Sequence, residues 1–179
     1  MTFRVHFYAE QAFLSQTKVM LDRRCSDEEP EAAAMCILAC ASAVEATANS
    51  LLSKEINFRH FDELRITSKI EKILIFGGTE PDWSVEPWQS VSRLIKMRNW
   101  LAHYKDYDIG LVNSDFEWIH DSVNKTPSID PYKELTFEKA QKYYDKSREA
   151  LHILVQSSGA DGSAFDFLLT EQYIPFLVG

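Results

Sequence analysis

The feature that most constrains this chain is a long apolar stretch, residues 32–53, in which Glu45 is the only formal charge. Apolar residues on every side predict a helix that other elements cover all round. Pro30 and the acidic residues around it are typical of a helix start. The uninterrupted apolar run, residues 32–44, is shorter than the roughly 20 residues that cross a bilayer. We therefore expect a central, buried helix and no membrane span.

Four further segments have apolar residues at helical spacing. They are residues 6–24, 62–76, 88–104 and 137–156. Gly77 and Gly78 are expected to stop the third of the five predicted helices, and Thr136 to cap the last. In the first helix the residues expected to share the buried side are Phe7, Ala12, Phe13, Val19 and Met20. The sequence thus predicts one all-α domain over residues 1–179, an up-and-down helical bundle of about five helices.

Two segments do not follow a helical pattern. Residues 106–134 mix glycine, asparagine, proline and isolated aromatic residues, which predicts an irregular insertion. Residues 164–179 are too apolar to remain in water, so we expect this C-terminal tail to pack on its own domain or on a partner subunit.

Net charge and cysteine usage narrow the function classes. A formal net charge of -8 at pH 7 is the wrong sign for wide phosphate binding, so any nucleic acid must meet a local basic patch. Cys25, Cys36 and Cys40 lack CxxC spacing, and the histidines are not spaced as metal ligands with them. We expect a cytoplasmic protein without disulfides, metal or other cofactor, and we find no signal-peptide pattern at the N-terminus.

The best candidate site is the segment RNWLAH, residues 98–103, at the end of the fourth predicted helix. Asn99 and His103 are four residues apart and share a helix face, so Asn99 can orient the imidazole. Arg98 and His103 are about 140° apart, so Arg98 must curl round the helix, act across a subunit boundary or use a local distortion. An imidazole can move protons and a guanidinium can stabilise a phosphorane, which together support RNA cleavage without metal.

A local positive field surrounds this segment. Residues 87–105 contain four basic side chains and no acid. Besides Arg98 these are Arg93, Lys96 and Lys105, which are candidates for phosphate binding. The alternative is that the basic run is an ordinary solvated face, balanced by acids elsewhere in the chain.

The central helix offers support for the site or a structural explanation of it. Glu45 and Asn49 lie on its single polar stripe and can assist Arg98 and His103. A carboxylate in an apolar helix must be paired or protonated. On the structural alternative, Arg98 pairs with Glu45 while His103 caps a helix end, and the motif only holds the bundle or a dimer together.

The helix ASAVEATANSLL, residues 41–52, followed after a shorter helix by LIKMRNWLAH, residues 94–103, resembles the HEPN superfamily. The two signatures and the closing helix cover about residues 31–156. Ribonuclease members carry Arg, a polar residue and a following His in a helical bundle that dimerises to bring two motifs together. The resemblance implies a homodimeric, metal-independent endoribonuclease, often a toxin or defence component. It also implies His103 as acid and base, Arg98 on the phosphate of RNA and Asn99 as the positioning residue.

The chain departs from one subgroup of this superfamily. Members silenced by nucleotidyl transfer have a tyrosine two residues after the histidine, where this chain has Lys105. That regulation is therefore not expected here. Two other functions stay open. The first is a non-catalytic HEPN-like module that binds an antitoxin or another protein partner, which the net charge and the apolar tail favour. The second is a small nucleotide-binding bundle that uses a pocket between the second and fourth helices.

Overall fold

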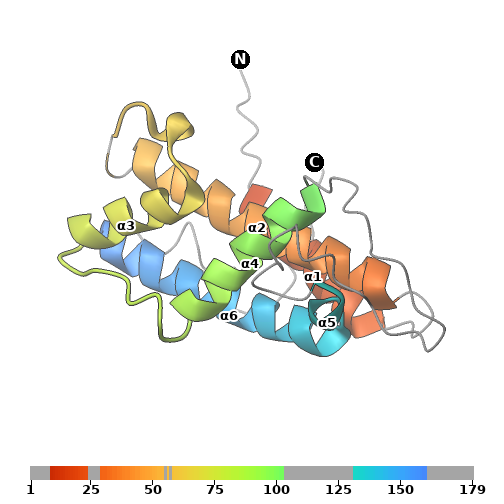
Figure 1. Ribbon diagram of the computed structural model, residues 1–179. Coiled ribbons are helices and arrows are strands. Elements are labelled where there is room, and N and C mark those ends of the chain that lie inside the picture. Colours follow the sequence, from red (N-terminus) through yellow and green to blue (C-terminus); the bar gives the residue numbers. More distant parts are fainter. Residues whose placement is uncertain (1–8, 24–28, 55, 57, 103–130, 161–179) are drawn as a thin grey trace, which may run out of the picture.

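The computed structural model describes residues 9–23, 29–54, 56, 58–102 and 131–160, and all structural statements below concern these residues. Over these ranges the chain forms five long helices, one four-residue helix, a 3₁₀ turn and no strand (Figure 1). The elements are α1 (Ala9–Arg23), α2 (Glu29–Lys54), the 3₁₀ turn (Phe61–Glu63), α3 (Ile66–Phe76), α4 (Trp88–Ala102), α5 (Pro131–Glu134) and α6 (Phe137–Ser158). The predicted all-α helical bundle is confirmed.

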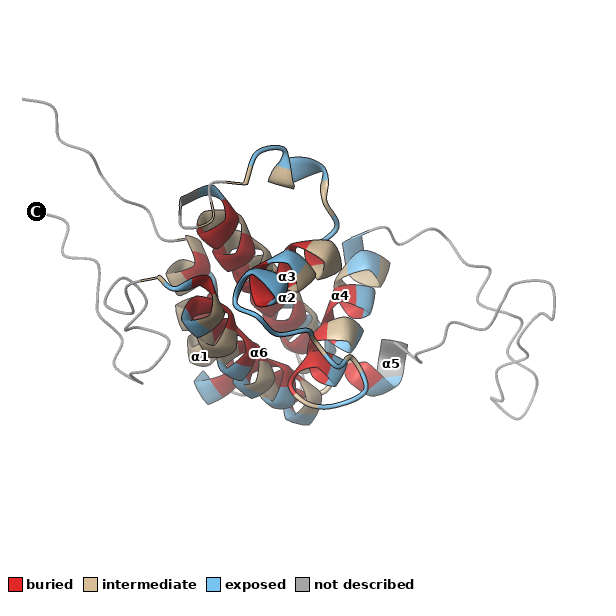
Figure 2. Ribbon diagram, turned by 90° about the vertical axis from the view of Figure 1, so that its left-hand side faces the viewer, coloured by how far each residue is buried: buried red, intermediate tan, exposed pale blue. Residues whose placement is uncertain are grey.

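Helix α2 is the centre of the bundle, as its apolar sequence predicts. It packs against α1, α3, α4 and α6, and α6 in turn contacts α1, α3 and α4. Figure 2 shows the buried faces of these helices turned toward one another. Along the chain, α1 and α4 run opposite to α2 and α6 (Figure 1). The helices α1, α2, α4 and α6 therefore alternate in direction along the chain, and the other long helices pack around α2.

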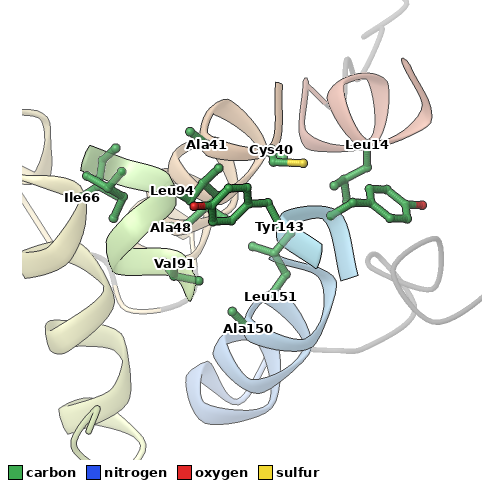
Figure 3. Close-up of a cluster of buried hydrophobic side chains, with 14 of the residues drawn as sticks. Leu14, Cys40, Ala41, Ala48, Ile66, Val91, Leu94, Tyr143, Ala150 and Leu151 are labelled. Carbon is green, nitrogen blue, oxygen red and sulfur yellow. The ribbon is translucent and has the colours of Figure 1, made fainter. Parts of the chain in front are cut away.

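The core is built from all five long helices. Leu94 of α4 and Tyr143 of α6 lie in one cluster with Ala41 and Ala48 of α2 (Figure 3). Alanine at these positions leaves room for the larger side chains of neighbouring helices. Each fully buried leucine-sized side chain contributes about 2 kcal/mol to folding. The fully buried apolar residues of α2 are Ala33, Cys36, Ile37, Cys40, Ala41, Ala43, Val44, Ala48, Leu51 and Leu52.

The same helix is long and apolar enough to span a membrane by length and composition alone, over Glu29–Ser53. More than half of this window, 56%, is buried inside the structure. The core helix of a soluble bundle passes the same test, and the four helices packed on α2 are the cover that such a core helix needs. The lack of a membrane span stays a prediction.

Helix α6 begins where two separate side chains satisfy its first backbone amides. The Thr136 hydroxyl accepts from the Lys139 amide at 3.3 Å, which confirms the predicted cap. Glu29 Oε1 accepts from the Phe137 amide at 2.8 Å, so the first residue of α2 also caps α6. The helix ends at Gly159, whose φ of 71° suits glycine.

Two predicted boundaries are wrong. Helix α3 begins at Ile66 rather than at residue 62, because Leu64 and Arg65 have extended backbone after the 3₁₀ turn. Leu64 and Ile66 are two residues apart, a spacing that a helix does not bring onto one face. Residues 131–134, expected within the irregular insertion, form α5, because Pro131 is well suited to a first helical position. The rest of the predicted insertion and the predicted C-terminal tail lie outside the described residues.

The buried face of α1 also differs from the prediction. Its buried residues are Glu10, Leu14, Thr17 and Leu21. Phe13, expected inside, is 37% exposed. Two of the four buried side chains are polar, so hydrophobic spacing indicated the wrong side. The Thr17 hydroxyl is satisfied locally, because it donates to the Phe13 carbonyl at 2.9 Å.

Two of the three cysteines act as buried apolar residues, as predicted. Cys36 and Cys40 are free thiols on α2 facing α1, where Cys40 Sγ lies 3.9 Å from Thr17 Oγ1. Burial raises the pKa of the Cys36 thiol from 9.0 to about 11. Burial likewise raises the pKa of Cys40 to about 12. Cys25 lies outside the described residues.

These thiols predict a loss of stability at alkaline pH. The unfolded chain loses thiol protons as pH rises above 9.0, while the folded chain holds them until about pH 11 or 12. The folded state then binds more protons than the unfolded state, so the free energy of unfolding falls. We expect the melting temperature of a Cys36→Ala/Cys40→Ala variant to fall less steeply than that of the wild type between about pH 8.5 and 10.5. Parallel curves for the two proteins would contradict this.

Candidate functional site

The candidate site is organised around Glu45, whose side chain is 30% exposed and lies between α3 and α4. Its Oε1 atom is 3.5 Å from the Nζ of Lys69 on α3. Its Oε2 atom is 3.5 Å from Nη2 of Arg98 on α4. Asn49, one turn further along α2, accepts a 2.7 Å hydrogen bond from Lys69 Nζ. The predicted polar stripe of the central helix thus gathers one cation from each of two neighbouring helices.

Lys69 is the residue that sequence reasoning missed. Its side chain is only 2% exposed, although lysine is almost never fully buried without a partner. A signal was present in the sequence, because Lys69 follows Ile66 by three positions and precedes Ile73 by four. That spacing places it on the apolar face of α3. The face is buried, so the ammonium group meets the carboxylate and amide of α2 instead of water.

Arg98 contacts both Glu45 and its own neighbour. Besides the contact with Glu45, Nη1 donates to Oδ1 of Asn99 at 3.1 Å. The Arg98 side chain is 34% exposed, so one side of the guanidinium faces solvent. Arg98 therefore reaches α2 directly, as the structural alternative expects. Asn99, predicted to orient His103, is exposed and holds the guanidinium.

Arg93 and Lys96 are the other predicted residues that the structure describes, and neither is brought together with Arg98. His103 and Lys105 lie outside the described residues, so the predicted Asn99–His103 pair stays a prediction. Arg93 and Lys96 are exposed on α4. At about 100° per residue they project at least 140° away from Arg98 around the helix axis. Arg93 and Lys96 therefore lie on a different side of α4 from Arg98.

The charges of the cluster do not cancel. Lys69 and Arg98 carry two positive charges, and Glu45 supplies one negative charge. Glu45 forms no other ion pair with the residues that the structure describes. At 3.5 Å both contacts are long for charge-assisted hydrogen bonds, and the partly exposed Arg98 contact is weakened by solvent. Counting only the residues that the structure describes, the cluster therefore has one surplus positive charge, and Arg98 is its solvent-facing end.

A second polar cluster, also missed by sequence reasoning, connects α4, α5 and α6. Tyr143 is buried and donates its hydroxyl proton to Glu134, which is also buried. Burial and Glu134 raise the pKa of Tyr143 far above its usual range, so the phenol stays protonated. Nearby, Glu86 accepts from Lys142 at 2.9 Å and from the Ser90 hydroxyl at 2.9 Å. These contacts fix α5 and the start of α4 against α6, a structural role.

Metal ligands do not gather anywhere in the part of the chain that the structure describes. No three histidine, cysteine, aspartate or glutamate side chains lie close enough together there to hold a metal ion. The chemistry available at Arg98 among these residues is therefore electrostatic: a guanidinium with surplus charge, fixed on a rigid helix.

Comparison of the chain with protein-family models, with curated proteins and with solved structures gave no match. The function is therefore inferred from the geometry of this site and from the motif in the sequence.

Proposed function

We propose that this chain is a HEPN-like, metal-independent endoribonuclease that acts on single-stranded or loop RNA as a homodimer. Arg98 binds the scissile phosphate, Asn99 positions Arg98, and His103 transfers protons. The proposal combines the Arg-Asn-x3-His motif with the position of Arg98 on a bundle whose central helix presents Glu45 to it.

The observation that carries the proposal is the surplus positive charge at Arg98. A guanidinium that is neutralised by one carboxylate has little net charge left to attract an anionic ligand. Here Arg98 shares the Glu45 carboxylate with Lys69. The Arg98 side chain is one-third exposed, and it has N–H groups for which no described residue provides an acceptor. Such a group can donate two parallel hydrogen bonds to a phosphate.

The reaction that fits these groups is transfer of the phosphate to the 2′-oxygen. The 2′-oxygen forms a bond to phosphorus while the bond from phosphorus to the 5′-oxygen breaks. One imidazole takes the proton of the 2′-hydroxyl, and a second acid gives a proton to the 5′-oxygen. Two copies of the motif in a homodimer supply both groups, and Arg98 stabilises the charge that develops on the phosphorane.

The proposal is tested by incubating the purified protein with labelled RNA in EDTA. We expect cleavage that leaves a 2′,3′-cyclic phosphate, because the 2′-oxygen is the nucleophile. We expect His103→Ala and Arg98→Ala each to lower the rate by about a hundredfold or more, as is usual for loss of an acid–base group or a charge stabiliser.

His152→Ala and Arg23→Ala are the matched controls, because both remove the same side-chain types from the surface of other helices. They should cleave at the wild-type rate. A folded wild type that leaves the RNA intact, or His103→Ala protein that cleaves equally well, would overturn the ribonuclease proposal.

A non-catalytic interaction module is the second candidate. The observation that favours it is a set of exposed apolar side chains at the end of α3 and in the following loop: Ile75 at 58%, Phe76 at 59% and Val85 at 50% exposure. Large apolar side chains that remain exposed to solvent are candidates for contact with a protein partner. An intact wild type that binds no RNA would favour this function.

A further inference from the structure

A lysine in the core is an unfavourable choice for this fold. Lys69 shares the buried face of α3 with Ile66 and Ile70, and it is 2% exposed. Removing an ammonium group from water costs several kcal/mol unless it is paired and hydrogen-bonded. A leucine or methionine would fill this place without that cost. The lysine therefore invites an explanation beyond packing.

The balance of charges around Glu45 supplies an explanation for the buried lysine. Because Lys69 is the most buried of the three charged groups, it depends most on the carboxylate. Its Nζ lies 3.5 Å from Glu45 Oε1, and the amide oxygen of Asn49 completes its shell at 2.7 Å. Glu45 is thus held from the core side by α3. Without Lys69, the carboxylate and Arg98 would form an ordinary neutral pair.

The two carboxylate oxygens face different cations. Oε1 faces Lys69 and Oε2 faces Arg98, so the contact with Lys69 fixes the direction in which the carboxylate meets the guanidinium. Nη2 of Arg98 contacts Glu45, and Nη1 of Arg98 donates to Asn99. Among the described residues its Nε–H group has no acceptor.

We propose that Lys69 is a positioning residue: it neutralises Glu45 from within the core and so leaves the charge of Arg98 available to a phosphate. The identity of the ligand as an RNA phosphodiester rests on the proposed function. The effect on Arg98 does not, because it follows from the arrangement of Lys69, Glu45 and Arg98 alone.

The first test measures binding of a 2′-O-methyl RNA oligonucleotide, which has phosphodiesters but no attacking hydroxyl. We expect Lys69→Met to weaken binding about tenfold, because Glu45 then loses its buried cation and neutralises Arg98. Adding Glu45→Gln should restore most of the affinity, since the competing carboxylate is then gone. A packing defect at position 69 would not be restored in this way.

Lys72→Met is the matched control, because Lys72 lies on the same helix, is exposed, and has its Nζ 4.7 Å from the Phe58 ring centre. It removes the same charge from the protein and should bind like the wild type. Wild-type affinity in Lys69→Met, or no recovery in the Lys69→Met/Glu45→Gln variant, would overturn the proposal.

A second measurement separates this proposal from the ribonuclease proposal. Arg98→Met is introduced into the wild type and into Lys69→Met, and both changes in melting temperature are compared. We expect the larger drop in the Lys69→Met background, where Glu45 has Arg98 as its partner. Equal decreases in melting temperature would overturn the role of Lys69, whatever the protein binds. A larger decrease in the Lys69→Met background, in a protein that neither binds nor cleaves RNA, would support the role of Lys69 while the ribonuclease proposal fails.

Discussion

Glu45→Ala is expected to destabilise the protein by about 2 to 3 kcal/mol, because it leaves the buried Lys69 without its negative partner. Breaking a buried ion pair from one side typically costs about 3 to 5 kcal/mol. Glu45 is 30% exposed and Asn49 still accepts from Lys69, so we place the value below that range. For a chain of 179 residues this corresponds to a fall in melting temperature of roughly 5 to 10 °C.

A double variant identifies the cause of this loss. Glu45→Ala/Lys69→Met should be more stable than Glu45→Ala, because no unpaired charge is then buried. Ser42→Ala is the control on the same polar stripe of α2 and should lie within about 0.5 kcal/mol of the wild type. If Glu45→Ala melts with the wild type, Lys69 does not depend on the carboxylate and our description of the cluster is wrong.

Gly77→Ala should also be strongly destabilising, by about 2 to 3 kcal/mol in thermal or urea unfolding. A Cβ atom at residue 77 would lie 2.5 Å from the carbonyl oxygen of Ser157 and 2.9 Å from its Cα. Those are backbone atoms of α6, so a side-chain rotation does not relieve the contact. The end of α3 must move away from α6, which disturbs packing in the core.

The adjacent glycine provides the control. Gly78 has φ of 79°, and a Cβ atom added there would have no other atom within 4 Å. Gly78→Ala therefore costs about 1 kcal/mol, through backbone strain alone. The two variants have the same composition, but Gly77→Ala meets the backbone of α6 whereas Gly78→Ala meets backbone strain alone. A Gly77→Ala variant as stable as Gly78→Ala would show that α3 and α6 are not in close contact there.

The outline of the fold was open to prediction because it depends on local properties. A stretch with one charge between residues 32 and 53 predicts a helix that other elements cover. Thr136, followed by apolar residues at helical spacing, predicts where α6 begins. Boundaries were harder to predict. Helix α3 begins at Ile66 instead of residue 62, and residues 131–134 are helical instead of irregular. The reason is that the pattern of a few residues does not distinguish a helical turn from a loop.

The candidate site was predicted in part. The sequence identified Arg98, Asn99 and Glu45 as candidate site residues, and in the structure Arg98 contacts both of the others. It did not identify Lys69, since the same apolar spacing fits a lysine that bends its stem out to water. Nor did it predict that Asn99 accepts from Arg98, because adjacent residues of a helix are not expected to face each other.

The apolar sequence around Glu45 by itself determined that α2 is central, since that follows from the lack of any other charge to face water. Only the tertiary structure decided which cations share the carboxylate. Burial depends on what packs opposite a side chain, and here residues 24 and 53 positions away from Glu45 supply the ammonium and the guanidinium. The charge left at Arg98 is therefore a property of three helices together.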